Sequence, residues 1–493
     1  MPRNLSAGRA IWSILVVLMI GMSLRVPSAI RDMRFQVDEA LYATIARQVT
    51  LHHDLYLINT IIDKPPLLFW AMGSALELFG VNEFAARLPN VAASLVTLAL
   101  IYALAKRLYP DWRVSLIATL LLAVSPFDRA FAATAFTDPL LTMFVLGGCV
   151  LALYGRWRLA GLALALAFAT KPSALQWIPL TIALAATQCT RWQRALRGVL
   201  DLATGFAIGF APLIIWSATR AVIPDFWALN LHNNNPERFI RAEELSPRLT
   251  AWLGWLNTIA PLPVIGWLSA PIQVIRQNLA GPIPFRSLTE NGTGVNADGP
   301  LNNPKSMTVS RAIAIDLILT TYTLGSLALW WLVAFPVYDR YLHTLAPLML
   351  LLCARVLVAV WNRLPLPFVG LAMLVLCMPL TTAQLAVAGD PAEFTGIDHL
   401  AAVLNTLPID TMVYDHSLGW ELGYYLGPKP PIRLIWQSTV DDLISSIKFH
   451  TGYWVAPRQE SDTWLYLLRG AGIKTVGKPL YADTHFVLLY LTL

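Results

Sequence analysis

Charged side chains are scarce in this sequence. Asp, Glu, Lys and Arg make up 13% of its 493 residues, against roughly 25% in a soluble domain. An ordinary soluble protein is therefore excluded, and the 56% hydrophobic fraction predicts a polytopic membrane protein. The net charge of +6 comes from basic residues scattered between apolar runs. This distribution favours basic cytoplasmic loops and argues against nucleic-acid binding.

Cysteine is also rare, and the chain lacks internal repeats and low-complexity tracts. The cysteines have no CxxC spacing and lie in or beside apolar runs: Cys149, Cys189, Cys353 and Cys377. Disulfides and a thiolate metal site are therefore not expected. The lack of repeats argues against a transporter, because transporters are commonly built from inverted repeats.

Long apolar runs predict about eleven membrane spans within residues 1–388. The first, residues 11–30, follows basic residues like a signal peptide but lacks a small-residue cleavage site, so we expect an uncleaved span. Its basic N-terminus belongs inside, which places the loop at 31–87 outside. Residues 67–79 are short for a span and begin beside charged residues, so we expect an interfacial helix there.

Basic turns lie on the N-terminal side of the membrane throughout this predicted topology. It includes an eighth span at 249–275, an inner loop at 276–311 and a last span at 364–387. From residue 389 onward, short β-rich runs alternate with helical patterns. The predicted strands are at 411–414, 432–436, 453–456 and 486–491. The predicted helices are at 399–407, 420–426, 441–449 and 463–470. This alternation predicts a small extracytoplasmic α/β domain with a mainly parallel sheet, residues 389–493.

The segment 36–70 concentrates polar chemistry beside the membrane. Asp38 and Glu39 open a helical pattern, where acids suit the helix N-terminus. A second charged pair, Asp63 and Lys64, directly precedes two prolines that can start the next helix. We therefore expect two acid-bearing helix starts to lie close together at one membrane face.

Ionisable residues from distant parts of the chain reach this same outer face in the predicted topology. They are Asp38, Glu39, Asp63, Lys64, Asp138, Lys171, His232, Arg340 and Tyr341. Charges in a membrane are costly, so they gather where water, protein or substrate satisfies them. This one-sided convergence predicts a polar site at the bilayer surface.

Each of these residues also has a plainer interpretation. Asp38 and Asp138 could be helix caps, and the two lysines could extend their ammonium groups to the interface. Arg340 and Tyr341 could be interface anchors. His232 could be an exposed loop histidine.

Three motifs in the first outer loop, DEALYATIAR, DKPPLLFW and GVNEFAARLP, resemble the GT-C glycosyltransferases. The resemblance is to the protein O-mannosyltransferase and aminoarabinose-transferase branch, and it covers residues 38–171 well. It implies a GT-C transmembrane domain and transfer of a sugar from a polyprenyl-phosphate donor. The acceptor, whether glycan, lipid or protein, is left open.

The resemblance also implies roles for individual residues. Asp38 matches the catalytic aspartate, Glu39 its orienting neighbour, and Asp138 the second-loop acid. Lys64, Lys171, Arg340 and Tyr341 match residues that meet the carrier phosphate. Asp63 stands where aminoarabinose transferases carry a metal-binding glutamate, so a divalent metal held with His232 is the one cofactor to consider. These are expectations drawn from the family.

The expected reaction is a single displacement with inversion. A carboxylate takes the proton of the attacking hydroxyl, while cations hold the leaving phosphate. Leu41 stands where aminoarabinose transferases have an arginine, which argues against lipid A as the acceptor. The competing predictions are a flippase for lipid-linked sugars and a non-catalytic envelope assembly factor. The expected location is the bacterial inner membrane, with the active site on the periplasmic side.

Overall fold

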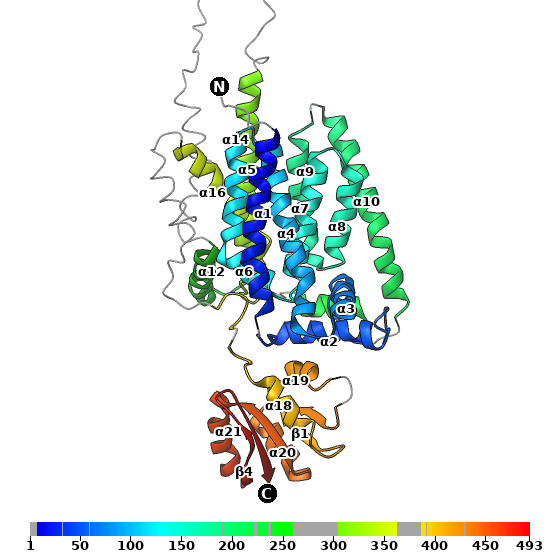
Figure 1. Cartoon of the computed structure of the whole chain (residues 1–493), viewed down its shortest axis with the longest axis vertical. Coiled ribbons are helices and arrows are strands. Elements are labelled where there is room, and N and C mark those ends of the chain that lie inside the picture. The colour runs from blue at the N-terminus through cyan, green and yellow to red at the C-terminus, as the bar shows by residue number, and fades with distance from the viewer. Residues whose placement is uncertain are drawn as a thin grey trace, which may run out of the picture.

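The computed structural model describes residues 7–493 apart from 32, 59, 190, 221–224, 235–237, 260–303, 362–385, 391 and 428–429. A bundle of helices forms the larger part, and a small α/β domain lies beyond one end of it (Figure 1). The N-terminus lies at the other end of the bundle. We call the end near the α/β domain the site end.

Four described helices are long and apolar enough to cross a membrane: α1 (Ala7–Ile30), α4 (Glu83–Leu108), α10 (Trp192–Ala218) and α14 (Pro304–Leu332). A fifth span is formed if α5 (Trp112–Val124) and α6 (Pro126–Ala132), which bend by 61° at their junction, are counted together. Shorter apolar helices complete the bundle: α7 (Asp138–Leu153), α8 (Trp157–Phe168), α9 (Trp177–Ala186) and α16 (Ala346–Trp361).

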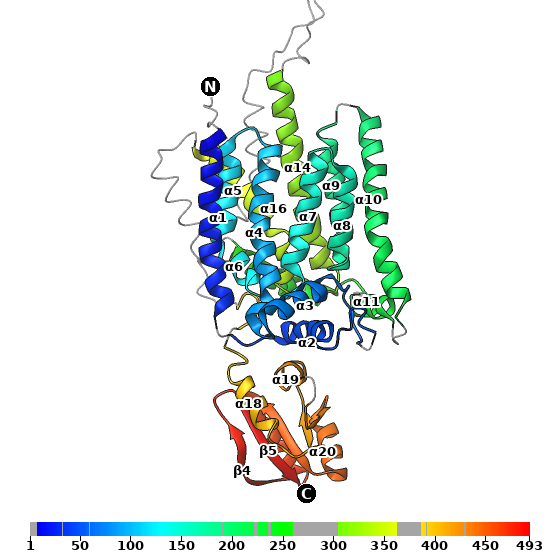
Figure 2. The same cartoon turned by 45° about the vertical axis from the view of Figure 1, so that its right-hand side comes forward.

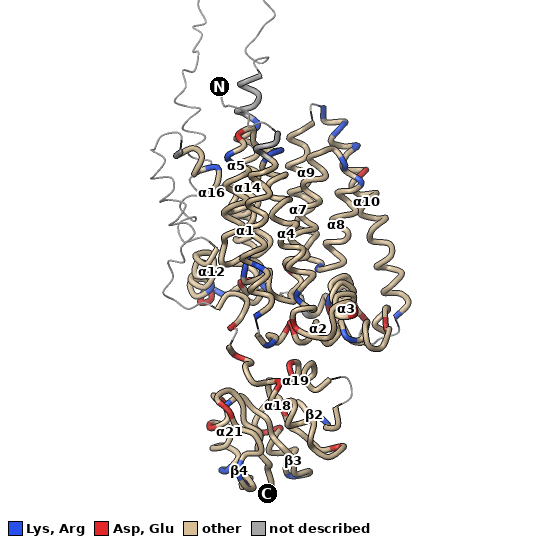
Figure 3. Tube along the Cα trace, viewed as in Figure 1, with Lys and Arg blue, Asp and Glu red and all other residues tan. Residues whose placement is uncertain are grey.

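The predicted membrane architecture is confirmed, whereas the count of about eleven spans stays a prediction. The last predicted span lies almost wholly outside the described residues, as does the second half of the eighth, whose first half is α12 (Leu245–Ile259). The predicted inner loop at 276–311 also lies mostly outside the described residues. The predicted domain boundary between residues 388 and 389 stays a prediction as well. Charged residues gather at the two ends of the bundle and are sparse along its middle, as Figure 3 shows.

Two helices lie across the site end of the bundle. They are α2 (Val37–Leu51) and α3 (Leu67–Phe79), and α2 lies between α3 and the α/β domain (Figure 2). The bounds of α3 are those predicted for the interfacial helix. The other short helices near this end are η1 (Pro172–Gln176), α11 (Phe226–Asn234), η2 (Ala242–Glu244) and α15 (Arg340–His343).

A buried ionic network fixes α15 against α1 and α6. Arg25 Nη2 lies 2.5 Å from Asp128 Oδ2, and His343 Nε2 lies 3.4 Å from Oδ1 of the same carboxylate. Arg25 Nη1 also donates to the carbonyl of Ala123, 2.8 Å away. Because all three charged or titratable side chains are buried, this network holds the end of α15, where His343 lies, in one position.

The α/β domain contains a five-stranded sheet of order β2-β1-β3-β5-β4. Its strands are β1 (Met412–Asp415), β2 (Arg433–Trp436), β3 (Gly452–Pro457), β4 (Lys474–Ala482) and β5 (Phe486–Thr492), with helices α18 (Ile397–Leu404), α19 (Gly419–Tyr425), α20 (Val440–Phe449) and α21 (Arg458–Gly470). Strands β2, β1 and β3 are parallel, but β5 is antiparallel to both β3 and β4. The expectation of a mainly parallel sheet was therefore only half correct: β5 returns beside β4 as a hairpin.

The domain is attached to α2 by direct hydrogen bonds. Arg47 donates to the carbonyls of Tyr424 and Gly423, at 2.6 and 3.1 Å. The hydroxyl of Tyr425 accepts the backbone N–H of Phe35 at 3.0 Å. The helix that carries Asp38 and Glu39 is thus held between the bundle and the α/β domain.

Candidate active site

The start of α2 places Asp38 and Glu39 in its first turn. Glu39 Oε2 accepts the backbone N–H of Gln36, the residue before the helix, at 3.1 Å. A carboxylate in this position satisfies an N–H group that the helix itself leaves unpaired. The predicted helix start is confirmed.

Glu39 is buried, and both of its carboxylate oxygens accept hydrogen bonds. It is 2% exposed, and its two oxygens accept from Arg87 on α4 at 3.1 and 3.2 Å. The backbone N–H of Ala135 donates to Oε1 at 2.8 Å. Glu39 therefore ties α2 to α4 and to the turn before α7, which agrees with an orienting role.

Asp38 forms an ion pair with Arg340, which lies 302 residues further along the chain. Its side chain is 32% exposed, so it can meet a substrate. The Arg340 guanidinium also lies 4.6 Å from the ring centroid of Tyr338. Burial alone would lower the pKa of Arg340, but the neighbouring charge of Asp38 raises it above the ordinary arginine value. Arg340 is therefore a permanent cation beside Asp38.

Asp138 and Lys171 form a second pair, from the start of α7 and the turn after α8. Lys171 Nζ lies 2.8 Å from Asp138 Oδ1, and both residues are buried. The same ammonium lies 5.2 Å from the ring centroid of Tyr341, a favourable cation–π distance. Tyr341 follows Arg340 directly, so α15 links the two ion pairs.

A cavity of about 290 Å³ opens at this second pair. Asp138, Lys171 and Tyr341 supply its polar wall. The rest of the lining is mainly apolar: Leu141, Leu175, Leu329, Trp330 and Phe335. A charged group beside an apolar lining suits a ligand with an anionic head and a hydrocarbon chain.

Asp63 and Lys64 form a third pair, with Nζ 2.5 Å from Oδ2. The side chain of Asn230 on α11 donates to the Asp63 carbonyl at 2.6 Å, which brings the helix of His232 to this loop. Lys64 lies near enough to Lys171 for the two ammonium charges to act on each other. It does not line the cavity just described.

The residues predicted to hold a metal do not assemble a ligand set. Within the described part of the chain, no group of three His, Cys, Asp or Glu side chains could hold an ion. Protein metal sites generally supply three or more such ligands, while Asp63 and His232 are only two, and Asp63 already pairs with Lys64. A metal held by these two residues stays a prediction, and no chemical step below depends on it.

Tyr42 is a member of the site that the sequence did not single out. It is buried one turn after Asp38 on α2, where the charges of Asp38, Arg340, Asp63 and Asp138 all act on it. Tyr42 follows Asp38 by four residues, a spacing that places both side chains on one face of the helix. From this spacing, Tyr42 could have been predicted as a site residue. Of the residues predicted to converge, the structure brings together Asp38, Asp63, Asp138, Lys64, Lys171, Arg340 and Tyr341. Glu39 is buried beside Asp38, and His232 lies exposed on α11.

Comparison with known proteins supports the architecture. A family model described as dolichyl-phosphate-mannose-protein mannosyltransferase matches residues 63–216. An undecaprenyl phosphate-alpha-4-amino-4-deoxy-L-arabinose arabinosyl transferase of Pseudomonas paraeruginosa is 28% identical over 300 residues, 57% of this chain and 53% of the relative. A Pseudomonas aeruginosa protein of the same name is 30% identical over 51% of this chain and 48% of its own length. The chain thus spans about half the length of the curated relatives it matches.

Two solved structures share the fold over nearly the whole chain. ArnT from Cupriavidus metallidurans, bound to undecaprenyl phosphate, has a TM-score of 0.63 at 17% identity, covering 99% of this chain and 98% of that one. The Archaeoglobus fulgidus oligosaccharyltransferase, in complex with zinc and sulfate, has a TM-score of 0.55 at 12% identity, covering 92% and 69%. The GT-C fold predicted from the first-loop motifs is therefore confirmed.

Proposed function

We propose that this chain is a membrane glycosyltransferase that transfers a sugar from a polyprenyl-phosphate donor to an acceptor hydroxyl or phosphate. The observation that carries the proposal is the pairing of Lys171 with Asp138 at the wall of an apolar cavity. The short helix α15 connects this pair to the partly exposed carboxylate of Asp38, through Tyr341 and Arg340. The names of the relatives, which include undecaprenyl phosphate and dolichyl phosphate, support this class of donor.

The donor would bind with its phosphate at Lys171 and Tyr341 and the start of its prenyl chain against Trp330 and Phe335. An ammonium group and a phenol hydroxyl both donate hydrogen bonds to phosphate oxygens. Binding of the phosphate would add a second negative charge beside the buried ammonium of Lys171, which pairs with Asp138 and lies against the Tyr341 ring in the free protein. Arg340 and Lys64 would add positive charge as the phosphate leaves.

Asp38 would be the general base in a single displacement. The acceptor oxygen attacks the anomeric carbon and passes its proton to the Asp38 carboxylate. The bond between that carbon and the phosphate oxygen breaks, and the phosphate keeps the electron pair. Since attack and departure take place on opposite faces of the sugar, the product has inverted configuration. Glu39, through Arg87 and Ala135, would fix the helix turn that aims Asp38.

The orientation in the membrane is part of the proposal. We place the N-terminus in the cytoplasm and the site end, with the α/β domain, on the periplasmic side of a bacterial-type inner membrane. The basic turns at the N-terminal end of the bundle, which include Arg191, Arg194 and Arg197 before and within α10, support this orientation.

The test is Asp38→Asn in the purified full-length protein, with a polyprenyl-phosphate sugar as donor and release of polyprenyl phosphate as readout. Loss of a general base predicts at least a 100-fold slower turnover, with the donor still bound. Asp201→Asn is a matched control, because Asp201 forms an exposed ion pair with Arg158 on helices α10 and α8, away from the site. Turnover in the Asp38 variant within a few-fold of wild type would refute the proposal. A flippase or an assembly factor would release no polyprenyl phosphate in either form.

A further inference from the structure

A large cavity lies in the α/β domain, outside the site described above. It has a volume of about 560 Å³ and is lined by His416, Ser417, Gly419, Trp420 and Trp436. Both tryptophans are largely exposed, at 56% for Trp420 and 67% for Trp436. We call it the aromatic cavity. Because exposing large apolar rings to water is costly, two of them at one cavity indicate a surface that a ligand covers.

The aromatic cavity lies at the carboxyl ends of two parallel strands. His416 and Ser417 follow β1, and Trp436 ends β2. Helix α19, which leads from β1 to β2, shares a core with Val413, whereas α20, which leads from β2 to β3, shares a core with Tyr414. Since neighbouring residues of a strand face opposite sides of the sheet, these two connections run on opposite faces. The cavity therefore lies where the strand order reverses, the place at which open α/β sheets bind ligands.

These strand ends face the helix bundle. Strand β5 ends beside the C-terminus, which lies at the end of the domain farthest from the bundle (Figure 1). Strand β3 is antiparallel to β5, and β1 and β2 run parallel to β3, so their carboxyl ends point back toward the bundle. Glu421, the residue after Trp420, is near enough to Asp38 for the two charges to act on each other. A ligand in the aromatic cavity would thus be held on the side of the domain that faces the membrane part.

Two side chains of the cavity hold each other in place. Trp436 Nε1 donates to the backbone carbonyl of His416 at 2.8 Å. His416 Nδ1 lies 2.9 Å from the backbone carbonyl of Gln437, and the ring of His416 packs on Trp464, with centroids 4.3 Å apart. The exposed indole of Trp436 is therefore fixed in one orientation before any ligand arrives, which lowers the entropic cost of binding.

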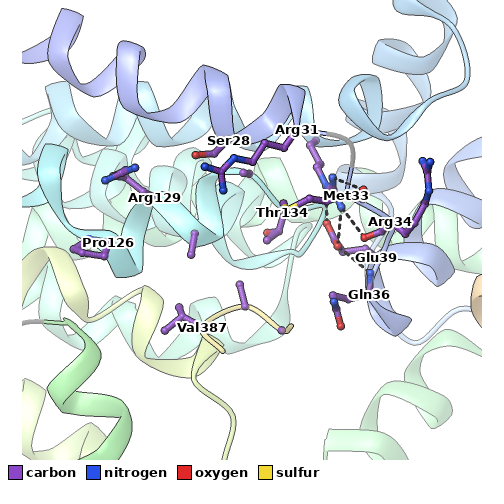
Figure 4. A pocket seen from close by; sticks show the side chains of 15 residues that line it. Ser28, Arg31, Met33, Arg34, Gln36, Glu39, Pro126, Arg129, Thr134 and Val387 are labelled. Carbon is purple, nitrogen blue, oxygen red and sulfur yellow. Dashed lines mark hydrogen bonds and ion pairs between the residues drawn. The ribbon is translucent and has the colours of Figure 1, made fainter. Parts of the chain in front are cut away.

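The lining favours an uncharged ligand that carries hydroxyl groups. Among the described residues, no Lys or Arg lines the aromatic cavity. It differs in this from the cavity between the end of α1, the start of α2 and α6, which four arginines line (Figure 4). Because the Gln437 carbonyl can only accept, His416 Nδ1 carries a proton, and Nε2 of the neutral ring is an acceptor. Glu460 Oε2, 4.0 Å from Nε2, is a second acceptor.

We propose that the aromatic cavity binds a neutral saccharide. The C–H hydrogens on one face of a pyranose ring carry a small positive charge, and they stack on the negative face of an indole, here that of Trp436 or Trp420. Hydroxyl groups of the sugar donate to His416 Nε2 and to Glu460, and the Ser417 hydroxyl can donate or accept. The inference goes beyond the proposed function, because binding by the α/β domain requires no transfer of a sugar.

The test is isothermal titration calorimetry of the full-length protein in detergent and in lipid nanodiscs. Maltotetraose, cellotetraose and chitotetraose are the neutral probes, and tetragalacturonate is the anionic comparison. We expect wild type to bind at least one neutral probe more tightly than tetragalacturonate. Trp436→Ala should weaken this binding at least about tenfold. Trp436→Phe, which keeps a ring and loses the hydrogen bond to His416, should be intermediate and guards against misfolding of the first variant.

Phe449→Ala is the matched control and should bind as wild type does. Phe449 is 84% exposed at the end of α20, which leads away from the carboxyl ends of the strands. Saturation-transfer NMR supplies a second readout: the ring C–H hydrogens of the bound probe should receive more saturation from wild type than from Trp436→Ala.

Equal binding by wild type and Trp436→Ala, or no binding of any neutral probe, would overturn the inference. Binding in detergent that disappears in nanodiscs would also overturn it, because the membrane would then cover the indoles, as it covers aromatic residues at membrane interfaces. A preference for tetragalacturonate would contradict the assignment to neutral sugars. These readouts need no sugar transfer, so they can fail while the Asp38→Asn test succeeds, and the reverse.

Discussion

The ammonium nitrogen of Lys171 lies 2.8 Å from a carboxylate oxygen of Asp138, and both side chains are buried at the site end of the bundle. The pair joins α7 to the turn between α8 and η1 across 33 residues of sequence. The charge of each group offsets part of the desolvation cost of burying the other. Stability and donor binding therefore depend on Lys171 in different ways.

Lys171→Gln should lower both stability and donor affinity. It leaves the Asp138 carboxylate buried without its partner, which costs about 3–5 kcal/mol. It also removes the cation proposed to meet the phosphate, so the KM for the donor should rise at least tenfold. The double variant Asp138→Asn/Lys171→Gln removes both charges and should recover thermal stability without recovering donor affinity. If stability and KM recovered together, Lys171 would have only a structural role.

Glu39→Gln should act on Asp38 through the position of α2. The substitution breaks the buried pair with Arg87, which stays behind unpaired, at a cost of about 3–5 kcal/mol. The shape of the side chain is kept, and the amide oxygen can still accept from Ala135. We expect a lower melting temperature and a reduced kcat with little change in KM for the donor. An unchanged kcat in a destabilised protein would show that Glu39 does not position the site.

Arg47→Ala should loosen the α/β domain from the bundle. Arg47 donates to the carbonyls of Gly423 and Tyr424 at the end of α19, which are among the acceptors that a helix leaves unpaired. Limited proteolysis should then cleave the chain faster near residues 386–396. Arg433→Ala is the control, since Arg433 forms an exposed pair with Asp410 inside the domain. Equal cleavage rates for the two variants would contradict a docking role.

The sequence predicted which residues meet, but not how they pair. Several apolar runs end at charged residues, among them Asp38, Asp138 and Lys171. A charge at the end of a membrane span can reach only the membrane surface at that end. The partner of Asp38 depends on helix packing, which no local pattern records, and Arg340 is 302 residues away. The family resemblance places both Lys64 and Arg340 at the phosphate, and this stays a prediction; in the free protein Arg340 lies against Asp38.

Two features escaped prediction for definite physical reasons. Strand β4 contains Gly477 with φ of 72° and Pro479, and its pairing with β5 shifts register between Val476 and Tyr481. Glycine and proline are depleted in strands, so the segment lacks a strand signal. The cavity between the end of α1, the start of α2 and α6 is lined by Arg31 and Arg129, which are separate in sequence and belong to no motif, so only the fold brings them together.

Glu421 should make the stability of the protein depend on pH. It is buried on α19, and neither carboxylate oxygen has a hydrogen-bond partner within the described residues. Burial raises its pKa to about 8, with further contributions from the charges of Asp415, Glu393 and Asp38. The folded protein therefore binds this proton more tightly than the unfolded chain does.

Between the ordinary glutamate pKa and about 8, unfolding releases the Glu421 proton, so stability falls as pH rises through this window. The loss is on the order of 5 kcal/mol by pH 9. Asp415, whose pKa burial raises to about 6, adds a slope of the same sign at lower pH. The melting temperature of the full-length protein in detergent should thus decline from pH 5 to pH 9. Glu421→Gln should flatten the upper part of that decline, whereas Glu460→Gln, at an exposed position of α21, should not. A decline that is identical in wild type and Glu421→Gln would show that Glu421 is ionised in the folded protein.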